Sequence, residues 1–420
     1  MSRRLGAGIV AAVLALAAPS EAQELRAILV GGGPDRESNQ VALENNLRWM
    51  LRMLPAPAVQ TVLFADASPT SRTVLYEQKL KPLAPAERLL RLLLYGREEA
   101  QPVEYRYRAR SLPRVDGPAS RDAVAQAFRR AGAHPDPRAP LLFYFTGHGS
   151  QDKRRDLDNN LLDLWGESLS VRELAAHVDA LPPSTPVTLV MVQCYAGAFG
   201  NLLFQGGDPQ NGLTDREIVG FFAAPKERSS AGCTPELDER EYRDFTSYFF
   251  AALTGRDRAG RKAGSADYDA DGRVGMSEAY HYAMIHDVSI DVPVCTTDIF
   301  LRRFVPLPDD EVFQTRYADI LAWATPAQRT ALERLSDALE LAGDDRVRKA
   351  HARWLLLNPD RRATAMEPLY RRWQAAARRA REWLLARWPD LRSAESRQFR
   401  AAWREAVDFL DRHLDSGRFG

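Results

Sequence analysis

The sequence has almost no excess of charge of either sign. It contains 57 lysines and arginines against 56 aspartates and glutamates, so its formal net charge is +1 over 420 residues. Proteins that bind nucleic acid or membranes through a global electrostatic field carry a large charge of one sign. No nucleic-acid partner is therefore expected, and the function has to be sought in local sites.

Long apolar runs are missing after the first twenty residues. At the N-terminus, two arginines precede an apolar run over residues 5–18, and small residues at positions 20 and 22 are typical of a cleavage site. This arrangement predicts a secretory signal peptide over residues 1–22 and a secreted or periplasmic mature protein without a membrane span. A retained N-terminal anchor is the alternative.

The known glycine-rich phosphate loops are also absent. Three glycines at positions 31–33 end the first expected strand, but neither the G-x-G-x-x-G pattern nor G-K-[ST] occurs there. These glycines are interpreted as a turn beside the edge of a sheet. With 45% hydrophobic and 27% charged residues, the composition is typical of a soluble globular protein of about two or three domains.

Two apolar runs predict neighbouring buried strands. Residues 141–146 stop at a glycine-flanked His148, and residues 187–193 stop at Cys194. A capping-box pattern between them predicts a helix over residues 170–181. Strand, helix and strand form a βαβ unit whose two strands are parallel, so His148 and Cys194 are expected at the same edge of the sheet.

A thiol and an imidazole at neighbouring strand ends can form a catalytic pair. The thiolate of Cys194 would be the nucleophile, and His148 would act as general acid and base. Gly149 permits close backbone approach, and the N–H groups of Gly149 and Cys194 could hold an oxyanion. Either residue alone would be interpreted as an ordinary buried cysteine or histidine.

The stretch QCYAG at residues 193–197, with His148 and Gly149 upstream, resembles the motifs of caspase-type cysteine peptidases. A second stretch resembles the legumain-like branch (C13, clan CD). It consists of AAPKERSSAGC at residues 223–233 and RDFTS at residues 243–247, and it is similar to the wall of legumain's specificity pocket. The resemblance covers roughly residues 25–304.

This resemblance implies a fold, a reaction and a substrate-binding set. The fold would be a caspase-like, mostly parallel sheet flanked by helices, in a peptidase domain over residues 23–305. The reaction would be hydrolysis of peptide bonds in peptides or proteins through a thioester acyl-enzyme. Ser229, Ser230 and Asp244 would bind substrate, and an N-cap before the next helix is the alternative for Asp244. Two other functions stay open, namely a non-proteolytic, calcium-stabilised interaction module and a transpeptidase that uses the same dyad.

Residues 267–278 (DYDADGRVGMSE) match the twelve-residue calcium loop. The expected ligands are Asp267, Asp269, Asp271, the carbonyl of Arg273, and Glu278. The stretch before the loop is rich in Gly and Arg and does not predict an entering helix, so a single half-hand with a structural Ca²⁺ is expected. A metal-free acidic turn is the alternative, and no organic cofactor is expected.

Only three cysteines occur, at positions 194, 233 and 295. With Cys194 as nucleophile, Cys233 and Cys295 could pair in an oxidising compartment. The sequence does not give the distance between them, so a disulfide and two free thiols both stay open.

The remaining stretches are less informative. The proline-punctuated residues 66–117 are expected to form an insertion over the site or a partly flexible loop. Residues 290–304 are expected to complete the sheet. Residues 309–420 predict an all-α C-terminal domain, including a last helix around Trp403, and its partner would be the peptidase domain itself or another protein. The arginines at 371–381 are interpreted as a solvated face, with an acidic partner as the alternative.

Overall fold

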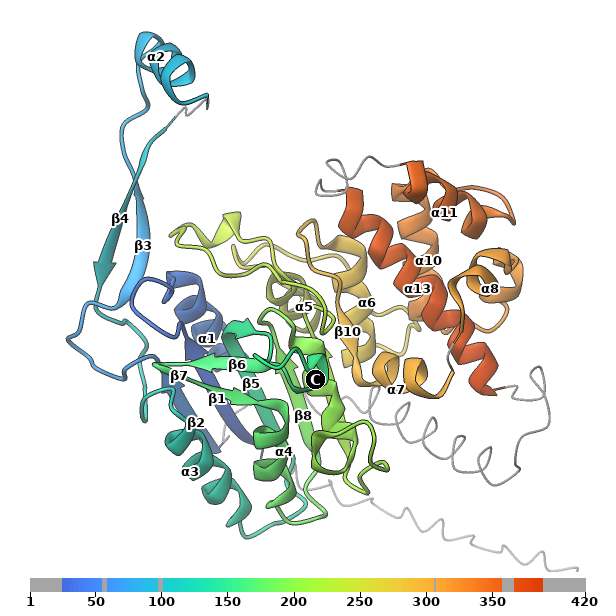
Figure 1. Cartoon of the computed structure of the whole chain (residues 1–420), viewed down its shortest axis with the longest axis horizontal. Coiled ribbons are helices and arrows are strands. Elements are labelled where there is room, and N and C mark those ends of the chain that lie inside the picture. Colours follow the sequence, from blue (N-terminus) through green and yellow to red (C-terminus); the bar gives the residue numbers. More distant parts are fainter. Residues whose placement is uncertain (1–24, 55–58, 97–100, 306, 357–365, 388–420) are drawn as a thin grey trace, which may run out of the picture.

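The computed structural model describes residues 25–54, 59–96, 101–305, 307–356 and 366–387 (Figure 1). The predicted signal peptide over residues 1–22 and the predicted helix around Trp403 lie outside these residues. Within the described ranges, no helix combines the length and the apolar character that crossing a bilayer requires.

The centre of the molecule is a six-stranded sheet of order β10-β9-β8-β5-β1-β2, extended by β6 and β7. Its strands are β1 (Arg26–Gly32), β2 (Val59–Phe64), β5 (Leu141–Ser150), β8 (Val187–Met191), β9 (Ile218–Phe222) and β10 (Val294–Cys295). The first five are parallel, and β10 runs antiparallel to β9. The structure confirms an α/β fold with a mostly parallel sheet flanked by helices.

Both faces of this sheet are covered, which explains why its strands are continuous apolar runs. Tyr144 of β5 packs against Phe250 of α5 (Phe245–Thr254), and its neighbour Phe143 packs against Phe128 of α3 (Arg121–Gly132). Successive strand residues point to opposite faces, so α5 and α3 lie on opposite sides. The first face also carries α1 (Val41–Met53) and α6 (Met276–His286).

The predicted βαβ unit is present. Ser170 caps α4 (Val171–Asp179), and the side chain of Glu173 accepts the Ser170 N–H as expected of a capping box. Beyond His148, the end of β5 pairs antiparallel with β6 (Leu161–Leu164), which pairs in turn with β7 (Glu167–Ser170).

Of the two expectations for residues 66–117, an insertion over the site or a partly flexible loop, the described part of this stretch is closer to the first, since it forms an insertion with regular secondary structure. The stretch contains a two-stranded antiparallel stalk of β3 (Val74–Lys79) and β4 (Val103–Arg108), with α2 (Pro85–Tyr95) at its far end. Figure 1 shows this arm projecting from the body of the molecule.

The prediction that residues 290–304 complete the sheet holds only for the two residues of β10. The chain then forms α7 (Thr296–Phe304), because Asp298 accepts the backbone N–H of Cys295 at 2.9 Å and starts a helix. A carboxylate in the first helical turn satisfies an otherwise unpaired backbone donor.

The described residues after 308 are helical, as predicted. They form α8 (Asp309–Gln314), α9 (Tyr317–Leu321), α10 (Pro326–Ala338), α11 (Arg346–Leu356) and α13 (Met366–Arg387). Helix α13 is joined to α7 by a fully buried ion pair, in which Arg379 donates to Asp298 at 2.8 Å. Trp373 and Trp383 of α13 are also buried, so these helices share the hydrophobic core of the sheet domain.

Candidate active site

The parallel register of β5 and β8 places His148 and Cys194 at the same height. Phe145 is aligned with Met191, and the N–H of Val192 donates to the Phe145 carbonyl at 3.1 Å. His148 follows Phe145 by three residues, and Cys194 follows Met191 by three. Both side chains therefore leave the sheet at the same edge, as the βαβ argument predicts.

Gly149 brings the two chains into direct contact. A Cβ atom built on Gly149 would lie 2.2 Å from the carbonyl oxygen of Cys194 and 2.6 Å from the side chain of Gln193. Only glycine fits between these groups, so the residue after the histidine lies against the backbone of the cysteine. This contact is the close approach that the glycine next to His148 predicts.

The ring of His148 is held from one side. Its Nε2 lies 2.9 Å from the Ser38 carbonyl oxygen and 3.0 Å from Oε1 of Gln40. A nitrogen that faces two acceptors carries the proton in the neutral ring. Nδ1 is then the unprotonated nitrogen, which can accept a proton from a thiol.

The sulfur of Cys194 receives a backbone hydrogen bond. The N–H of Ser230 lies 3.3 Å from Sγ and points a backbone donor at the sulfur. Tyr195, which follows the cysteine, has a left-handed φ of 60°, and its N–H donates to the Arg228 carbonyl at 2.8 Å. The sharp turn after β8 is thus tied to the segment that contains Ser230.

The segment over residues 228–233 contacts both halves of the pair. Besides the bonds to Tyr195 and Cys194, the Cys233 thiol lies 3.6 Å from the carbonyl of Gly147, next to His148. The buried carboxylate of Asp291 fixes the segment by accepting the Ala231 N–H at 2.6 Å. Burial, followed by the nearby Asp287, raises the pKa of Asp291 far above its ordinary value.

The three predicted substrate-binding residues are placed differently. Ser230 lies at the sulfur, whereas Ser229 is exposed. Asp244 is 2% exposed and caps α5, with Oδ1 accepting the N–H of Ser247 at 2.7 Å. Its Oδ2 is buried without a hydrogen-bond partner in the described part of the chain, and a Cβ on Gly232 would lie 3.5 Å from it. Asp244 therefore has the capping role that the sequence left as the alternative, with a second oxygen beside the 228–233 segment.

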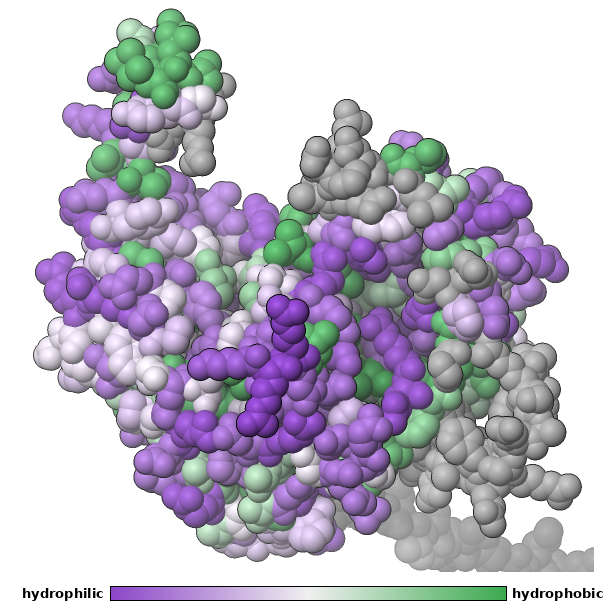
Figure 2. Space-filling view, viewed as in Figure 1, coloured by the Kyte–Doolittle hydropathy of each residue, from purple (hydrophilic) through white to green (hydrophobic). Residues whose placement is uncertain are grey.

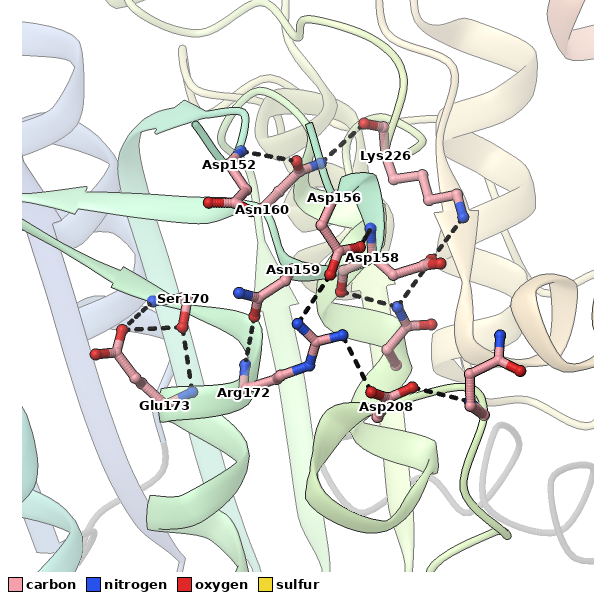
Figure 3. Close-up of polar contacts among 12 residues, drawn as sticks. Asp152, Asp156, Asp158, Asn159, Asn160, Ser170, Arg172, Glu173, Asp208 and Lys226 are labelled. Carbon is pink, nitrogen blue, oxygen red and sulfur yellow. Dashed lines mark hydrogen bonds and ion pairs between the residues drawn. The ribbon is translucent and has the colours of Figure 1, made fainter. Parts of the chain in front are cut away.

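A polar network beside the site organises the loop that follows β5 (Figure 3). Arg172 of α4 donates to Asp156 at 2.8 Å and to Asp208 at 3.1 Å. Asp158 pairs with Lys226 at 2.6 Å, and although burial opposes it, this pair lowers the pKa of the Asp158 carboxyl. The acidic loop over residues 156–160 thus joins α4 to the segment after β9.

The predicted calcium ligands are brought together in part. The carboxylates of Asp267, Asp269 and Asp271 lie within 4.8 Å of one another. Glu278 does not join them in this structure, because its oxygens accept the backbone N–H groups of Tyr268 at 2.6 Å and of Gly275 at 2.8 Å. The geometry fits a cation-binding loop with three carboxylates and does not identify the metal.

All three cysteines are free, so Cys233 and Cys295 are not paired in this structure. Cys295 is buried and accepts a hydrogen bond from Arg379 at 2.7 Å. Burial raises the pKa of Cys295 to about 11, and burial together with the neighbouring Cys194 raises that of Cys233 further. Because their pKa values are raised, neither Cys233 nor Cys295 readily forms a thiolate, and Cys194 is left as the candidate nucleophile.

Sequence reasoning missed the residues that position this site. Gln40 and the Ser38 carbonyl hold the histidine, and Asp291 anchors the 228–233 segment. Each lies far along the chain from the group that it contacts, and a single polar residue carries no local signal of such a contact.

Comparisons with known proteins add little to this geometry. No protein-family model matches the chain, and no curated protein matches it at a significant level. Among solved structures, the protein GSU0716 of Geobacter sulfurreducens is similar at a TM-score of 0.37 and 14% identity, over 65% of this chain and 92% of that one.

Proposed function

We propose that this protein is a secreted or periplasmic cysteine endopeptidase related to the caspase-like and legumain-like (clan CD, C13) peptidases. Cys194 would be its nucleophile and His148 its general acid and base. The observation that carries the proposal is the contact of Gly149 with the Cys194 backbone, at the point where β5 and β8 end in register.

The proposed reaction follows from the hydrogen bonds. Nδ1 of His148 accepts the thiol proton of Cys194, because Nε2 already faces two acceptors. The sulfur attacks the scissile carbonyl carbon, and the N–H groups of Gly149 and Cys194 stabilise the oxyanion. The imidazolium then donates its proton to the leaving amine, which leaves a thioester that water hydrolyses to the acid and the free thiol.

The segment over residues 228–233 would form one wall of the substrate pocket. Ser230 lies at the sulfur, and the buried acids Asp244 and Asp291 lie behind the segment. The oxygen of Asp244 that has no hydrogen-bond partner among the described residues could accept a hydrogen bond from a basic or amide side chain of the substrate. The loop over residues 267–278 would bind a structural Ca²⁺, since hard carboxylate oxygens are the ligands that this ion prefers.

The decisive experiment is labelling with a thiol-directed peptidyl electrophile, together with cleavage of a peptide library. Cys194→Ala should abolish both signals, and His148→Ala should lower both by on the order of a hundredfold or more. Cys295→Ala, which removes a buried thiol away from the site, should retain them.

Full activity of Cys194→Ala would disprove the peptidase proposal. An unlabelled but folded parent chain would favour the non-proteolytic module instead. Release of amide products in the presence of an added amine would indicate a transpeptidase with the same dyad.

A further inference from the structure

The helix at the end of the arm buries none of its residues against the rest of the molecule. Its large apolar side chains are all exposed, at 57% for Leu89, 56% for Leu90, 42% for Leu92, 73% for Leu93, 64% for Leu94 and 72% for Tyr95. Figure 2 shows them gathered at the tip of the arm. A contiguous apolar patch of this kind on a soluble protein marks a binding surface.

The apolar face of α2 is unusually broad. Successive helical residues are rotated by about 100°, so the five leucines between Leu89 and Leu94 cover an arc of roughly 200°. Glu87, Arg88, Arg91 and Tyr95 occupy the rest of the circumference. The helix is thus amphipathic, with two arginines and a tyrosine along its polar side.

We propose that α2 is a membrane-docking element that inserts its leucine face into the headgroup boundary of an anionic lipid surface. A helix that enters a protein groove presents a narrower stripe of anchors spaced three and four residues apart. The arc of α2 is wider than the stripe that enters a single groove, and an interfacial helix buries a face of this kind at the headgroup boundary.

Three cavities on the described part of the body are poor receptors for the apolar face of α2. They have volumes of about 600, 230 and 380 Å³, and each contains at least two arginines. An apolar helix buried against a guanidinium would leave that charge desolvated and unpaired. Docking of the tip into one of these cavities in another copy is therefore disfavoured.

The charge of the tip is complementary to an anionic surface. Helix α2 itself carries two arginines and one glutamate. Arg88 and Arg91 lie on the polar side of α2, where they would face headgroups when the leucines are inserted. Tyr95 is suited to the same boundary because its ring is apolar and its hydroxyl is polar.

The stalk connects this tip to the edge of the sheet that carries the candidate active site. At its base, the N–H of Leu75 donates to the Asn39 carbonyl at 2.8 Å, and that of Glu77 donates to the Pro235 carbonyl at 2.7 Å. Lys79 also forms an ion pair with Glu236. The next residue after Asn39 is Gln40, which contacts His148. A docked tip would therefore hold the site edge towards the lipid surface.

Vesicle flotation of the mature chain, without the predicted signal peptide over residues 1–22, tests this proposal without any assay of peptidase activity. We expect the parent chain to float with vesicles of phosphatidylcholine and phosphatidylglycerol, and less with phosphatidylcholine alone. Leu89→Ser combined with Leu93→Ser should weaken binding about tenfold or more. Leu356→Ser removes a leucine that is 85% exposed on α11 and should leave binding unchanged. Arg88→Gln with Arg91→Gln should reduce binding chiefly to the anionic vesicles, and more so at low salt.

Circular dichroism and thermal melting should show that all variants keep the fold, because α2 supports no other element. The proposal is wrong if the parent chain does not bind anionic vesicles, or if the double leucine variant binds as well as the parent. A third result is a parent chain that does not bind vesicles but forms dimers that are lost in the double leucine variant. That result would show that the tip binds a second copy of the chain instead.

Discussion

Arg228 and Glu367 form a two-pronged ion pair, with Nη1 to Oε1 at 3.0 Å and Nη2 to Oε2 at 2.9 Å. Arg228 belongs to the segment that lines the candidate site, and its carbonyl accepts the N–H of Tyr195. Glu367 lies in the first turn of α13, and Arg371 one turn later also donates to it. The C-terminal helices therefore fasten the segment that contacts the proposed nucleophile.

Glu367→Gln should loosen this segment. The Glu367 side chain is 9% exposed, and removal of one partner of such a pair leaves a guanidinium poorly compensated, at a cost of about 1 to 3 kcal/mol. We expect a lower midpoint of urea unfolding and a slower rate of Cys194 alkylation. As a control, Asp345→Asn disrupts exposed ion pairs on α11 and should change stability by no more than about 0.5 kcal/mol. Equal behaviour of the two variants would contradict a positioning role for Glu367.

Gly149→Ala should damage the site directly. The added methyl group would meet the Cys194 carbonyl oxygen at 2.2 Å, and the backbone can relieve this clash only by moving one strand end away from the other. We expect a loss of about 2 kcal/mol in stability and a fall in Cys194 labelling of about tenfold or more. Gly212→Ala is the matched control, because its nearest neighbour would lie 3.8 Å away. A fully labelled Gly149→Ala variant would show that the two strand ends need not touch.

Acid should destabilise the fold through His281. This residue of α6 is 1% exposed, and its Nδ1 donates to the Ser277 carbonyl at 2.7 Å. Burial, followed by the positive charge of Arg379, lowers the pKa of His281 to about 3. The unfolded chain takes up a proton near the ordinary histidine value of about 6.5, whereas the folded chain does not. The stability that His281 contributes is therefore complete above that value and is lost as the pH falls towards 3.

Chemical denaturation at several pH values measures this contribution as a difference between variants. Relative to His281→Gln, the parent chain should lose about 2 to 3 kcal/mol of stability between pH 7 and pH 4.5. His134→Gln, which removes a half-buried histidine outside the core, should show the same pH dependence as the parent. Parallel curves for the parent and His281→Gln would mean that the buried ring titrates normally.

Calcium should stabilise the chain through the loop over residues 267–278. Binding to the folded state alone contributes about 1 to 2 kcal/mol when calcium exceeds its dissociation constant ten- to thirtyfold. Thermal unfolding with calcium and with a chelator measures this difference. Asp269→Asn removes one of the three clustered carboxylates and should abolish it, whereas Asp215→Asn, at an exposed acid outside the cluster, should not. If calcium does not change the melting temperature, the loop is a metal-free acidic turn.

The central strands and the position of the proposed dyad could be predicted because their signals are local. The run that begins at Leu141 is β5, and the run that begins at Val187 is β8. Both are apolar on two faces and end at glycine or polar residues, so each pattern has one physical interpretation. The parallel alignment of β5 and β8 followed from the helix between them.

The arm, α7 and the groups that hold the histidine could not be predicted in the same way. The strand residues of β4 are mostly charged or aromatic, so no buried face marks them in the sequence. Helix α7 starts where Asp298 satisfies a backbone donor after a cysteine, which is an unusual cap. Gln40 contacts His148 across 108 positions of the chain, and only the assembled fold creates that contact.

The buried pair of Arg379 and Asp298 bears on how the protein could be activated. A cut between α7 and α8 would break the polypeptide but leave this ion pair, Trp373 and Trp383 in place. Removal of α13 would leave the Asp298 carboxylate buried and without its ion-pair partner, at a cost of several kcal/mol in stability. The nicked fragments should therefore co-migrate as a stable complex. A maturation step that discards the C-terminal helices would have to disrupt part of the sheet domain as well.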